Sequence, residues 1–304
     1  MNLPNLVIGG APKCGTSSLF AWLADHPEAC GSTVKETFYL MDKGHPLARP
    51  GANYHDHGLT GYETYFRNCS SQHRIRFEAT THYLYQQTAI DVLSQLKPAP
   101  QIIFILRKPS ERVYSSFQYS KNNLANVNRG LSFARFVDAS QNSTDGPLLA
   151  QQGGASAYVL KRDVGYSRYI EYLSRWTASF GADRIHIFLF EDMKRDPRGF
   201  MQTLAARIGI EPRFYDAYDF AVKNETVSIR NSSLHRRARK LNGAIPRGRV
   251  KKLLKNVYLK AQAKPNGNGK SPEDREALLR LDRDFAPFNQ RLAKELGIDV
   301  SAWE

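Results

Sequence analysis

Apolar residues occur along this chain in short, nearly continuous runs that alternate with longer stretches of helical spacing. The runs at Leu6–Gly10, Ile75–Thr80, Gln101–Leu106 and Ile185–Phe190 have the length of single β-strands. The third run is almost wholly apolar, as expected of a parallel strand that is covered on both faces. The four runs therefore predict a mainly parallel sheet.

The stretches between and after these runs carry apolar residues at helical spacing. The predicted helices cover Ser17–Asp25, Gln86–Leu96, Gly165–Phe180, Pro197–Ile208 and Pro272–Leu296. Strands and helices in alternation predict an α/β fold of three layers, with helices on both faces of a central, mainly parallel sheet. Two polar segments, Met41–Gln72 and Asn122–Gly154, interrupt this order. We expect them to be loop insertions that frame a cleft.

The composition is that of a globular protein. The 304 residues are 41% hydrophobic and 11% aromatic, which suffices for a single domain spanning residues 1–304. No apolar run of about 18 residues and no signal-peptide pattern is present, so we expect a cytoplasmic protein. The three cysteines, Cys14, Cys30 and Cys69, show neither metal spacing nor a disulfide framework.

Positive charge is concentrated in one segment, residues 223–270. It holds fourteen Lys or Arg residues and one acid, Glu225, and so carries almost all of the net charge of +14. Such a block indicates an anionic partner (an acidic glycan, a nucleic acid or a membrane surface) or else a solvated face. Apolar residues recur within it at the spacing of a basic amphipathic helix. They are Val250, Leu253, Leu254, Val257, Tyr258 and Ala261.

A glycine-rich turn joins the first predicted strand to the first predicted helix. Gly10 and Gly15 have the spacing of a nucleotide P-loop, in which amides at a helix N-terminus hold a phosphate. Thr16 stands where a Walker loop has its lysine, and the lysine lies inside the turn instead, as Lys13. The turn therefore predicts a P-loop-like fold that holds a phosphate-like group but is not built for a magnesium-bound triphosphate. Cys14 is interpreted as a small residue that fits the turn, with a nucleophile as the alternative.

Four segments that together span nearly the whole chain carry a family pattern. They are Pro12–Leu19 (PKCGTSSL), Lys35–Leu40 (KETFYL), Ile103–Ser115 (IFILRKPSERVYS) and Phe285–Leu292 (FAPFNQRL). The first resembles the 5′-phosphosulfate loop, and the third the 3′-phosphate segment, of the sulfotransferases that use 3′-phosphoadenosine 5′-phosphosulfate (PAPS). The second resembles the acidic segment of the heparan-type, carbohydrate-acting branch. A soluble bacterial member of that branch is expected.

The resemblance implies PAPS as the sulfuryl donor, adenosine 3′,5′-bisphosphate as the product, and no metal. The residues expected to hold the 5′ side of the donor are Lys13, Cys14, Gly15, Thr16, Ser17 and Ser18. Lys13 would also meet the charge that develops on the bridging oxygen as the S–O bond breaks. Arg107 is expected to bind the 3′-phosphate, with Ser115 as a hydrogen-bond donor eight residues on. Arg230, in the stretch 224–233, resembles the basic contact of a loop that closes over the nucleotide.

The same resemblance makes Glu36 the expected general base, because a positioned carboxylate can accept the proton of a hydroxyl acceptor. Lys35 beside it is expected to contact acceptor or donor. Glu78, in the stretch EATTHYL, is the second candidate acid, and His82 is either a second base or a structural histidine. Both are also candidate substrate contacts, as Lys35 is. The heparan-type stretch has a lysine where this chain has Ala79, which weakens the case for a heparan acceptor.

These observations predict a sulfotransferase that acts on an acceptor hydroxyl of a carbohydrate or glycan, with the two insertions framing the acceptor cleft. A lipid-linked or small-molecule acceptor is the alternative within this class, and the basic segment would then contact an anionic membrane peripherally. A P-loop kinase or NTPase is the alternative from another class. The missing Walker lysine and the lack of a magnesium-binding aspartate after the later strands argue against it. Nucleic acid is not an expected partner, because no recognisable binding module accompanies the basic segment.

Overall fold

The computed structural model describes most of the 304-residue chain. The described residues are 2–124, 127–128, 130–141, 155–220 and 269–304, with the backbone of 228–229 and 263–264. The chain forms two compact units. The first comprises Met1–Arg112, Arg168–Asn224 and Phe285–Glu304, and the second comprises Val113–Ser167 and Glu225–Asp284. One domain over residues 1–304 stays a prediction.

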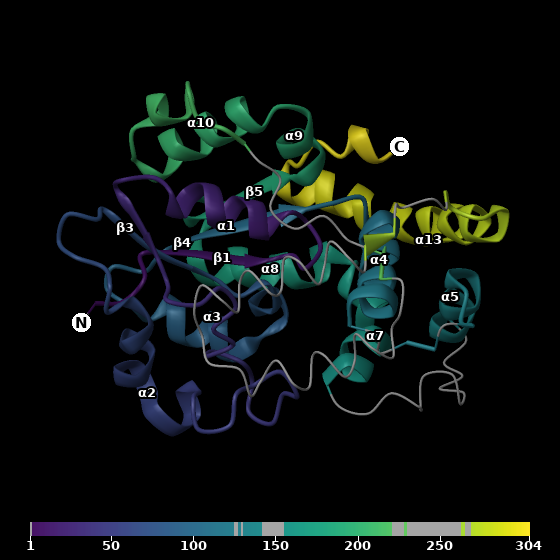
Figure 1. The fold of residues 1–304 in the computed structure, drawn as a ribbon, viewed down its shortest axis with the longest axis horizontal. Helices are drawn as coiled ribbons and strands as arrows, with labels where there is room; N and C mark the ends of the chain where they lie inside the picture. The colour runs from purple at the N-terminus through teal and green to yellow at the C-terminus, as the bar shows by residue number, and fades with distance from the viewer. Residues whose placement is uncertain are drawn as a thin grey trace. The chain divides into compact units, whose positions relative to one another are not determined.

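The first unit is built on a five-stranded sheet with the strand order β2-β3-β1-β4-β5 (Figure 1). The strands are β1 (Leu6–Gly10), β2 (Ala29–Gly31), β3 (Ile75–Ala79), β4 (Gln101–Leu106) and β5 (Ile185–Leu189). Every pairing in this sheet is parallel, and Leu6 of the central strand lies opposite Phe77 of β3 and Gln101 of β4. The predicted parallel sheet and its four predicted strands are confirmed. The additional strand, β2, has only three residues and is too short to show as an apolar run.

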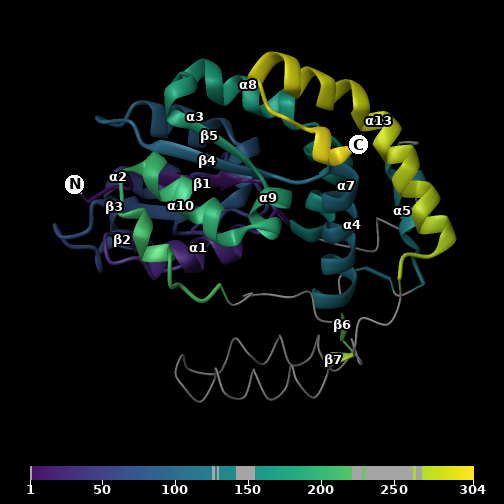
Figure 2. The same ribbon diagram turned by 90° about the horizontal axis from the view of Figure 1, so that it is seen from above.

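Helices cover both faces of the sheet, so the first unit has three layers (Figure 2). The covering helices are α1 (Thr16–Ala24) and α10 (Pro197–Ile208) on one face and α3 (Gln87–Ser94) and α8 (Tyr169–Phe180) on the other. Aromatic rings join the layers. Phe104 of β4 meets Trp176 of α8 with ring centroids 5.2 Å apart, and Phe188 of β5 meets Phe200 of α10 at 5.1 Å. This arrangement confirms the predicted three-layer α/β fold.

The remaining elements are shorter or lie outside the sheet layers. In the first unit they are α2 (Tyr54–Glu63), η1 (Thr64–Phe66), η2 (Thr81–Tyr85), η4 (Ala182–Arg184), α9 (Phe190–Arg195), η5 (Pro212–Tyr215) and η6 (Ser301–Trp303). In the second they are η3 (Tyr119–Asn123), α5 (Phe133–Gln141), α7 (Ala155–Tyr166), β6 (Ser228–Ile229) and β7 (Ala263–Lys264). The two helices with residues in both units are α4 (Pro109–Gln118) and α13 (Pro272–Leu296).

The two segments predicted as loop insertions contain helices as well as loops. α2 lies in the first of them and α5 in the second. Asn53 caps α2 by accepting a hydrogen bond from the Asp56 amide, and Gly58, with a φ of 54°, interrupts the helix. Because a glycine and several polar residues break the apolar spacing, the sequence pattern did not indicate α2.

The cysteines contradict the sequence-based expectation. Cys30 on β2 and Cys69 form a disulfide, with their Cα atoms 5.6 Å apart, and Cys14 is the free, buried thiol. The prediction of no disulfide framework is therefore wrong. β2 pairs with β3, and Cys69 lies in the turn that leads into β3. This pairing brings together two residues that are 39 positions apart in the sequence, which spacing alone does not reveal.

Among the residues that the structure describes, no helix is long and apolar enough to cross a bilayer. Most of the basic segment 223–270, including the predicted amphipathic helix, lies outside the described residues.

Candidate active site

The glycine-rich turn after β1 leads directly into α1. Gly15 precedes this helix with a φ of 79°, a left-handed conformation that favours glycine. A Cβ atom at this position would lie 2.2 Å from Met193 and 2.9 Å from the Phe190 ring, so α9 packs directly against the turn. The amides of Thr16 and Ser17, in the first turn of α1, have no intrahelical acceptor. The turn thus has the geometry of an anion site at a helix N-terminus.

Lys13 and Cys14 lie within this turn. Lys13 has a φ of 69° and a partly exposed side chain, whereas Cys14 is fully buried. Burial raises the pKa of the Cys14 thiol to about 11, and its sulfur lies 3.9 Å from the Tyr169 hydroxyl. A thiol that keeps its proton at neutral pH is a poor nucleophile. The geometry therefore favours the interpretation of Cys14 as a small residue that fits the turn.

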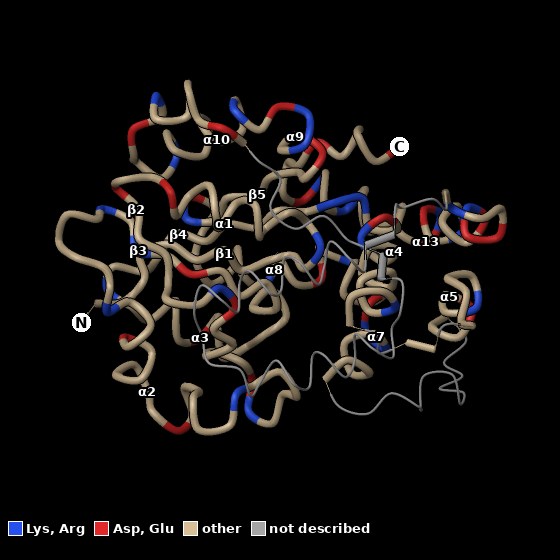
Figure 3. The backbone as a smooth tube through the Cα atoms, in the orientation of Figure 1, with Lys and Arg blue, Asp and Glu red and all other residues tan. Residues whose placement is uncertain are grey.

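Basic residues lie directly after the carboxyl end of β4 (Figure 3). Arg107 lies with its guanidinium carbon 5.0 Å from the centre of the Phe190 ring and donates to Glu111 at 3.4 Å. Arg112 is 1% exposed, and its charge acts with that of Arg107 to favour the ionised form of the Cys14 thiol. Two guanidinium groups therefore lie beside the phosphate loop. Sequence reasoning missed Arg112, because an arginine in a polar helical segment has the pattern of a surface residue.

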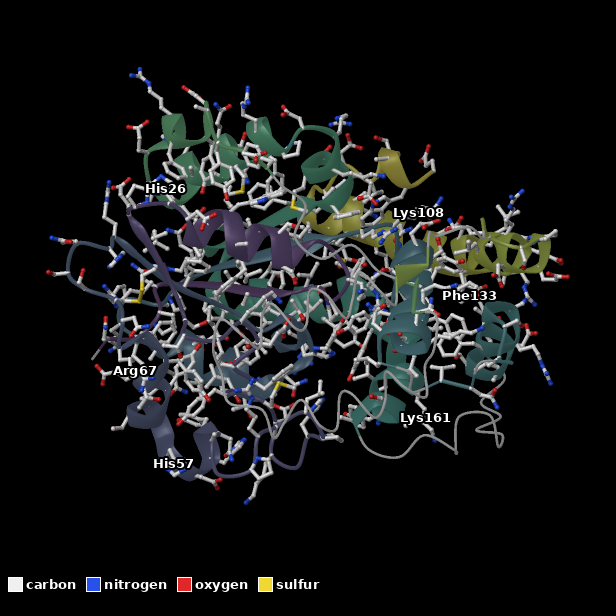
Figure 4. The ribbon with its side chains drawn as sticks, viewed as in Figure 1. His26, His57, Arg67, Lys108, Phe133 and Lys161 are labelled. Carbon is white, nitrogen blue, oxygen red and sulfur yellow. A yellow bond between two sulfur atoms is a disulfide. The ribbon has the colours of Figure 1, made fainter. Side chains whose placement is uncertain are left out.

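The carboxylate of Glu191, in α9, connects the segment after β4 with the η6 turn. It accepts a hydrogen bond from the Lys108 amide at 3.0 Å and another from the Trp303 indole at 3.1 Å. Lys108 is labelled in Figure 4, where β4 gives way to α4. The carbonyl of Arg107 accepts from the Tyr169 hydroxyl at 2.9 Å. These contacts hold the end of the chain and α8 against the backbone that carries Arg107.

Glu36 lies in a tight turn after β2. Glu36 and Phe38 have φ angles of 62° and 52°, in the left-handed region that costs a non-glycine residue about 1–2 kcal/mol. Hydrogen bonds hold the turn in this conformation. The Glu36 amide donates to the Ala79 carbonyl at 2.9 Å, and Arg49 donates to the Glu36 carbonyl at 2.7 Å. The surrounding structure therefore determines where the Glu36 side chain points.

The Glu36 carboxylate is bound at both oxygens. The Thr81 amide donates to Oε2 and the Thr81 hydroxyl to Oε1, each at 3.1 Å, and Lys35 Nζ lies 2.6 Å from Oε1. The side chain remains 25% exposed. A Cβ atom on Gly10 would lie 3.0 Å from Leu84 and 3.2 Å from the Thr81 carbonyl oxygen. The η2 turn, whose Thr81 binds the Glu36 carboxylate, therefore packs against the phosphate loop.

Glu78 lies beneath this turn and is fully buried. One carboxylate oxygen accepts from the Tyr62 hydroxyl, and the other accepts from Thr37 at 2.9 Å and from Thr80 at 2.6 Å. Burial raises the pKa of Glu78. Tyr62 in turn stacks on the Tyr39 ring, with centroids 5.2 Å apart. These hydroxyl contacts give Glu78 the geometry of a structural group under the Glu36 turn.

His82 follows Thr81 in the η2 turn. Both of its ring nitrogens are buried, and neither has a hydrogen-bond partner in the described part of the chain. The ring lies 6.2 Å from Phe38 and 6.1 Å from Tyr85, measured between centroids. Burial lowers the pKa of His82 to about 4, although the Glu36 charge opposes this shift. The imidazole is therefore neutral at physiological pH.

Some predicted site residues are not brought together with the others. Ser115 belongs to the second unit, and Arg230 lies outside the described residues, so their contacts with the nucleotide stay predictions. The described residues contain no group of three or more His, Cys, Asp or Glu side chains that could hold a metal.

Comparison with known proteins gives consistent results. A family model described as the sulfotransferase domain matches residues 3–233. The chain is 25% identical over 218 residues to bifunctional heparan sulfate N-deacetylase/N-sulfotransferase 1 of Caenorhabditis elegans, covering 71% of this chain and 23% of that protein. It is 27% identical over 211 residues to the protein of the same name from Xenopus laevis, covering 68% and 22%. The chain thus spans less than a quarter of the length of these relatives.

Among solved structures, the chain is similar to a sulfotransferase from Alicyclobacillus acidocaldarius. The TM-score is 0.66 at 20% identity, and the match covers 100% of this chain and 99% of the other. This likeness supports the fold. The family model covers well over half of the chain and includes both the phosphate loop and the Glu36 turn, so the chain belongs to the sulfotransferase family.

Proposed function

We propose that this chain transfers the sulfuryl group of PAPS to a carbohydrate acceptor, with Glu36 as the general base. One observation carries the proposal: Thr81 binds both oxygens of Glu36 and packs through its own carbonyl against Gly10 of the phosphate loop. A partly exposed carboxylate is thereby held next to an anion site within one compact unit. Removing an acceptor proton beside a bound phosphosulfate requires this juxtaposition.

The residues of the phosphate loop fit the 5′ side of PAPS. The φ angle of Gly15 and its contact with α9 leave no room for a side chain, so backbone amides can approach the ligand closely. PAPS, when bound, supplies the sulfuryl group and leaves as adenosine 3′,5′-bisphosphate. Lys13 meets the charge that develops on the bridging oxygen, and Glu36 takes the acceptor proton. Arg107, with Ser115 and Arg230, would bind the nucleotide.

Two further residues, Lys35 and Glu78, support this chemistry without carrying it. Lys35 is paired with the Glu36 carboxylate, and it would contact either the acceptor or the donor. Glu78 is enclosed by hydroxyl groups, so we assign it the task of supporting the Glu36 turn rather than that of the base.

A carbohydrate acceptor is supported by the relatives, which are named for heparan sulfate. It is also supported by a pocket of about 380 Å³ in the first unit. The residues that line it include Tyr39, Tyr65 and His57 and the threonines Thr60 and Thr64. Figure 4 labels His57. Aromatic rings and hydroxyl groups in one hollow suit the apolar faces and hydroxyls of a sugar.

The nucleotide is tested by thermal stabilisation. Adenosine 3′,5′-bisphosphate should raise the melting temperature in the presence of EDTA, and ATP with magnesium should not. Equal stabilisation by ATP, or loss of transfer in EDTA, would refute PAPS as the metal-independent donor.

The base is tested by Glu36→Gln, which keeps the shape of the side chain and removes its basicity. Turnover should fall at least ~100-fold, while affinity for adenosine 3′,5′-bisphosphate stays within about twofold. Glu276→Gln, on an exposed side chain, is the matched control. Near wild-type turnover in the Glu36 variant would move the role to Glu78 or His82.

The acceptor is tested with labelled PAPS and two forms of one polysaccharide, heparosan before and after removal of its N-acetyl groups. The acetylated form offers hydroxyls alone, whereas the deacetylated form adds amines. Transfer to the acetylated form supports the predicted hydroxyl acceptor. Transfer to the deacetylated form alone would replace the hydroxyl with an amine.

A further inference from the structure

His82 presents two buried hydrogen-bonding atoms that the described protein does not use. Neither ring nitrogen has a partner in the described residues. Burying such a group without a partner costs about 1–3 kcal/mol, so unpaired buried nitrogens are rare in folded proteins. His26 is a buried histidine whose ring is paired. Nε2 of His26 lies 3.0 Å from the Glu211 carbonyl oxygen, and Nδ1 accepts a hydrogen bond from the Glu28 amide at 3.1 Å. Figure 4 labels His26.

The place of His82 indicates what its partner is. It follows Thr81, the residue that binds the Glu36 carboxylate. Its ring centroid lies 6.2 Å from that of Phe38, in the Glu36 turn, and 6.1 Å from that of Tyr85. Among the charges that act on the imidazole, that of Glu36 is the strongest. The unpaired ring therefore lies close to the proposed base.

The chemistry of the ring narrows the class of ligand. A neutral imidazole offers one N–H donor and one acceptor lone pair on separate atoms. Sulfate and phosphate oxygens only accept hydrogen bonds, so they would leave one nitrogen unpaired. Hydroxyl groups both donate and accept, and neighbouring hydroxyls of a sugar satisfy both nitrogens.

We propose that His82 is an acceptor-binding residue, which holds the acceptor by hydrogen bonds to the hydroxyl groups that flank the reacting one. This inference rests on the proposed function and adds to it a specific contact. His82 orients the sugar, and Glu36 removes the proton.

The first test needs no acceptor. In the free protein, replacing the ring by an apolar side chain removes two unpaired nitrogens, so His82→Phe or His82→Leu, whichever packs better, should raise the melting temperature by about 2 °C or more. The matched control is His26→Phe, which should lower it because both nitrogens of His26 are paired. A lower melting temperature in both His82 variants would show that the nitrogens are satisfied without a ligand, and would overturn the proposal.

The second test uses heparosan oligosaccharides, acetylated or deacetylated, whichever the wild type sulfates. His82→Phe should raise the acceptor KM about tenfold, leave kcat within about threefold, and leave affinity for adenosine 3′,5′-bisphosphate unchanged. His82→Gln and His82→Asn each retain one donor nitrogen, and at least one should recover part of the KM.

Three results of the second test would overturn the proposal: an unchanged KM, a kcat that collapses at constant KM, or weakened binding of the bisphosphate. The second result would identify a base and the third a donor contact. Failure of the proposed function has a different signature. The wild type would then neither be stabilised by the bisphosphate nor sulfate either form of heparosan, whereas the melting temperatures would still decide whether the nitrogens are unpaired.

Discussion

The disulfide between Cys30 and Cys69 is expected to contribute substantially to stability. It closes a loop between residues 39 positions apart, and this loop carries Lys35, Glu36 and the aromatic pocket. In the chain-entropy description, cross-linking a loop of this length removes about 13 cal/mol/K from the unfolded state, or about 4 kcal/mol at 25 °C. Dividing this free energy by the unfolding entropy of a chain of this size gives a fall of about 6 °C in melting temperature when the disulfide is removed.

The disulfide is removed in the double variant Cys30→Ser/Cys69→Ser. Thermal and urea unfolding of this variant are compared with those of the wild type, with and without dithiothreitol. The variant and the reduced wild type should melt together, about 6 °C below the oxidised wild type. Cys14→Ser is the control, since its thiol lies outside the closed loop. Affinity for adenosine 3′,5′-bisphosphate should be retained, because the phosphate loop also lies outside it.

Thiol counting checks the premise. The denatured, oxidised protein should show one reactive thiol and the reduced protein three. Melting temperatures within 1 °C of each other, with the bond present by thiol count, would refute the loop-entropy reasoning. Because disulfides persist mainly in oxidising compartments, an oxidised pair in protein taken directly from its source would also contradict the cytoplasmic location expected from the sequence.

Three further predictions concern the site and the basic segment. Lys13→Ala should lower kcat more than it weakens binding of adenosine 3′,5′-bisphosphate, and Arg107→Ala should do the reverse; calorimetry and steady-state kinetics separate the two. Burial holds the pKa of His82 near 4, below its unfolded value of 6.5, so the unfolded state alone gains a proton as the pH falls between them. The contribution of His82 to the free energy of unfolding should therefore drop by up to about 3 kcal/mol from pH 6.5 to 4. In urea unfolding, His82→Leu should remove this part of the pH dependence. Changing three lysines of the segment 223–270 to Gln should raise the KM for an anionic acceptor at low salt and leave PAPS affinity unchanged, whereas unchanged kinetics would leave a solvated face. The three are Lys251, Lys252 and Lys255.

Local sequence patterns were sufficient to predict an element wherever a residue type has a single physical consequence. The strand at 101–106 could be predicted because a strand covered on both faces must be apolar throughout. The helix at 197–208 has the predicted bounds because Asp196 caps it and a proline begins it. The phosphate loop could be located because Gly15 needs a left-handed φ directly before a helix.

Features that depend on neighbours distant in sequence could not be predicted and became visible in the folded chain. Cys30 and Cys69 meet because β2 pairs with β3. Arg112 is buried beside the phosphate loop although its own helix is polar. Spacing along a chain carries no information about such contacts, since they depend on how strands are ordered and which helices cover them.

The same limit applies to the proposed base and its neighbour. An acidic segment and a phosphate loop could be recognised from the residues alone. The tertiary structure was needed to show that Thr81 binds both oxygens of Glu36 and that the His82 nitrogens have no partners among the described residues. Both depend on segments that are distant in sequence, because a side chain's partners are set by the elements that fold around it and not by the residues beside it in the chain.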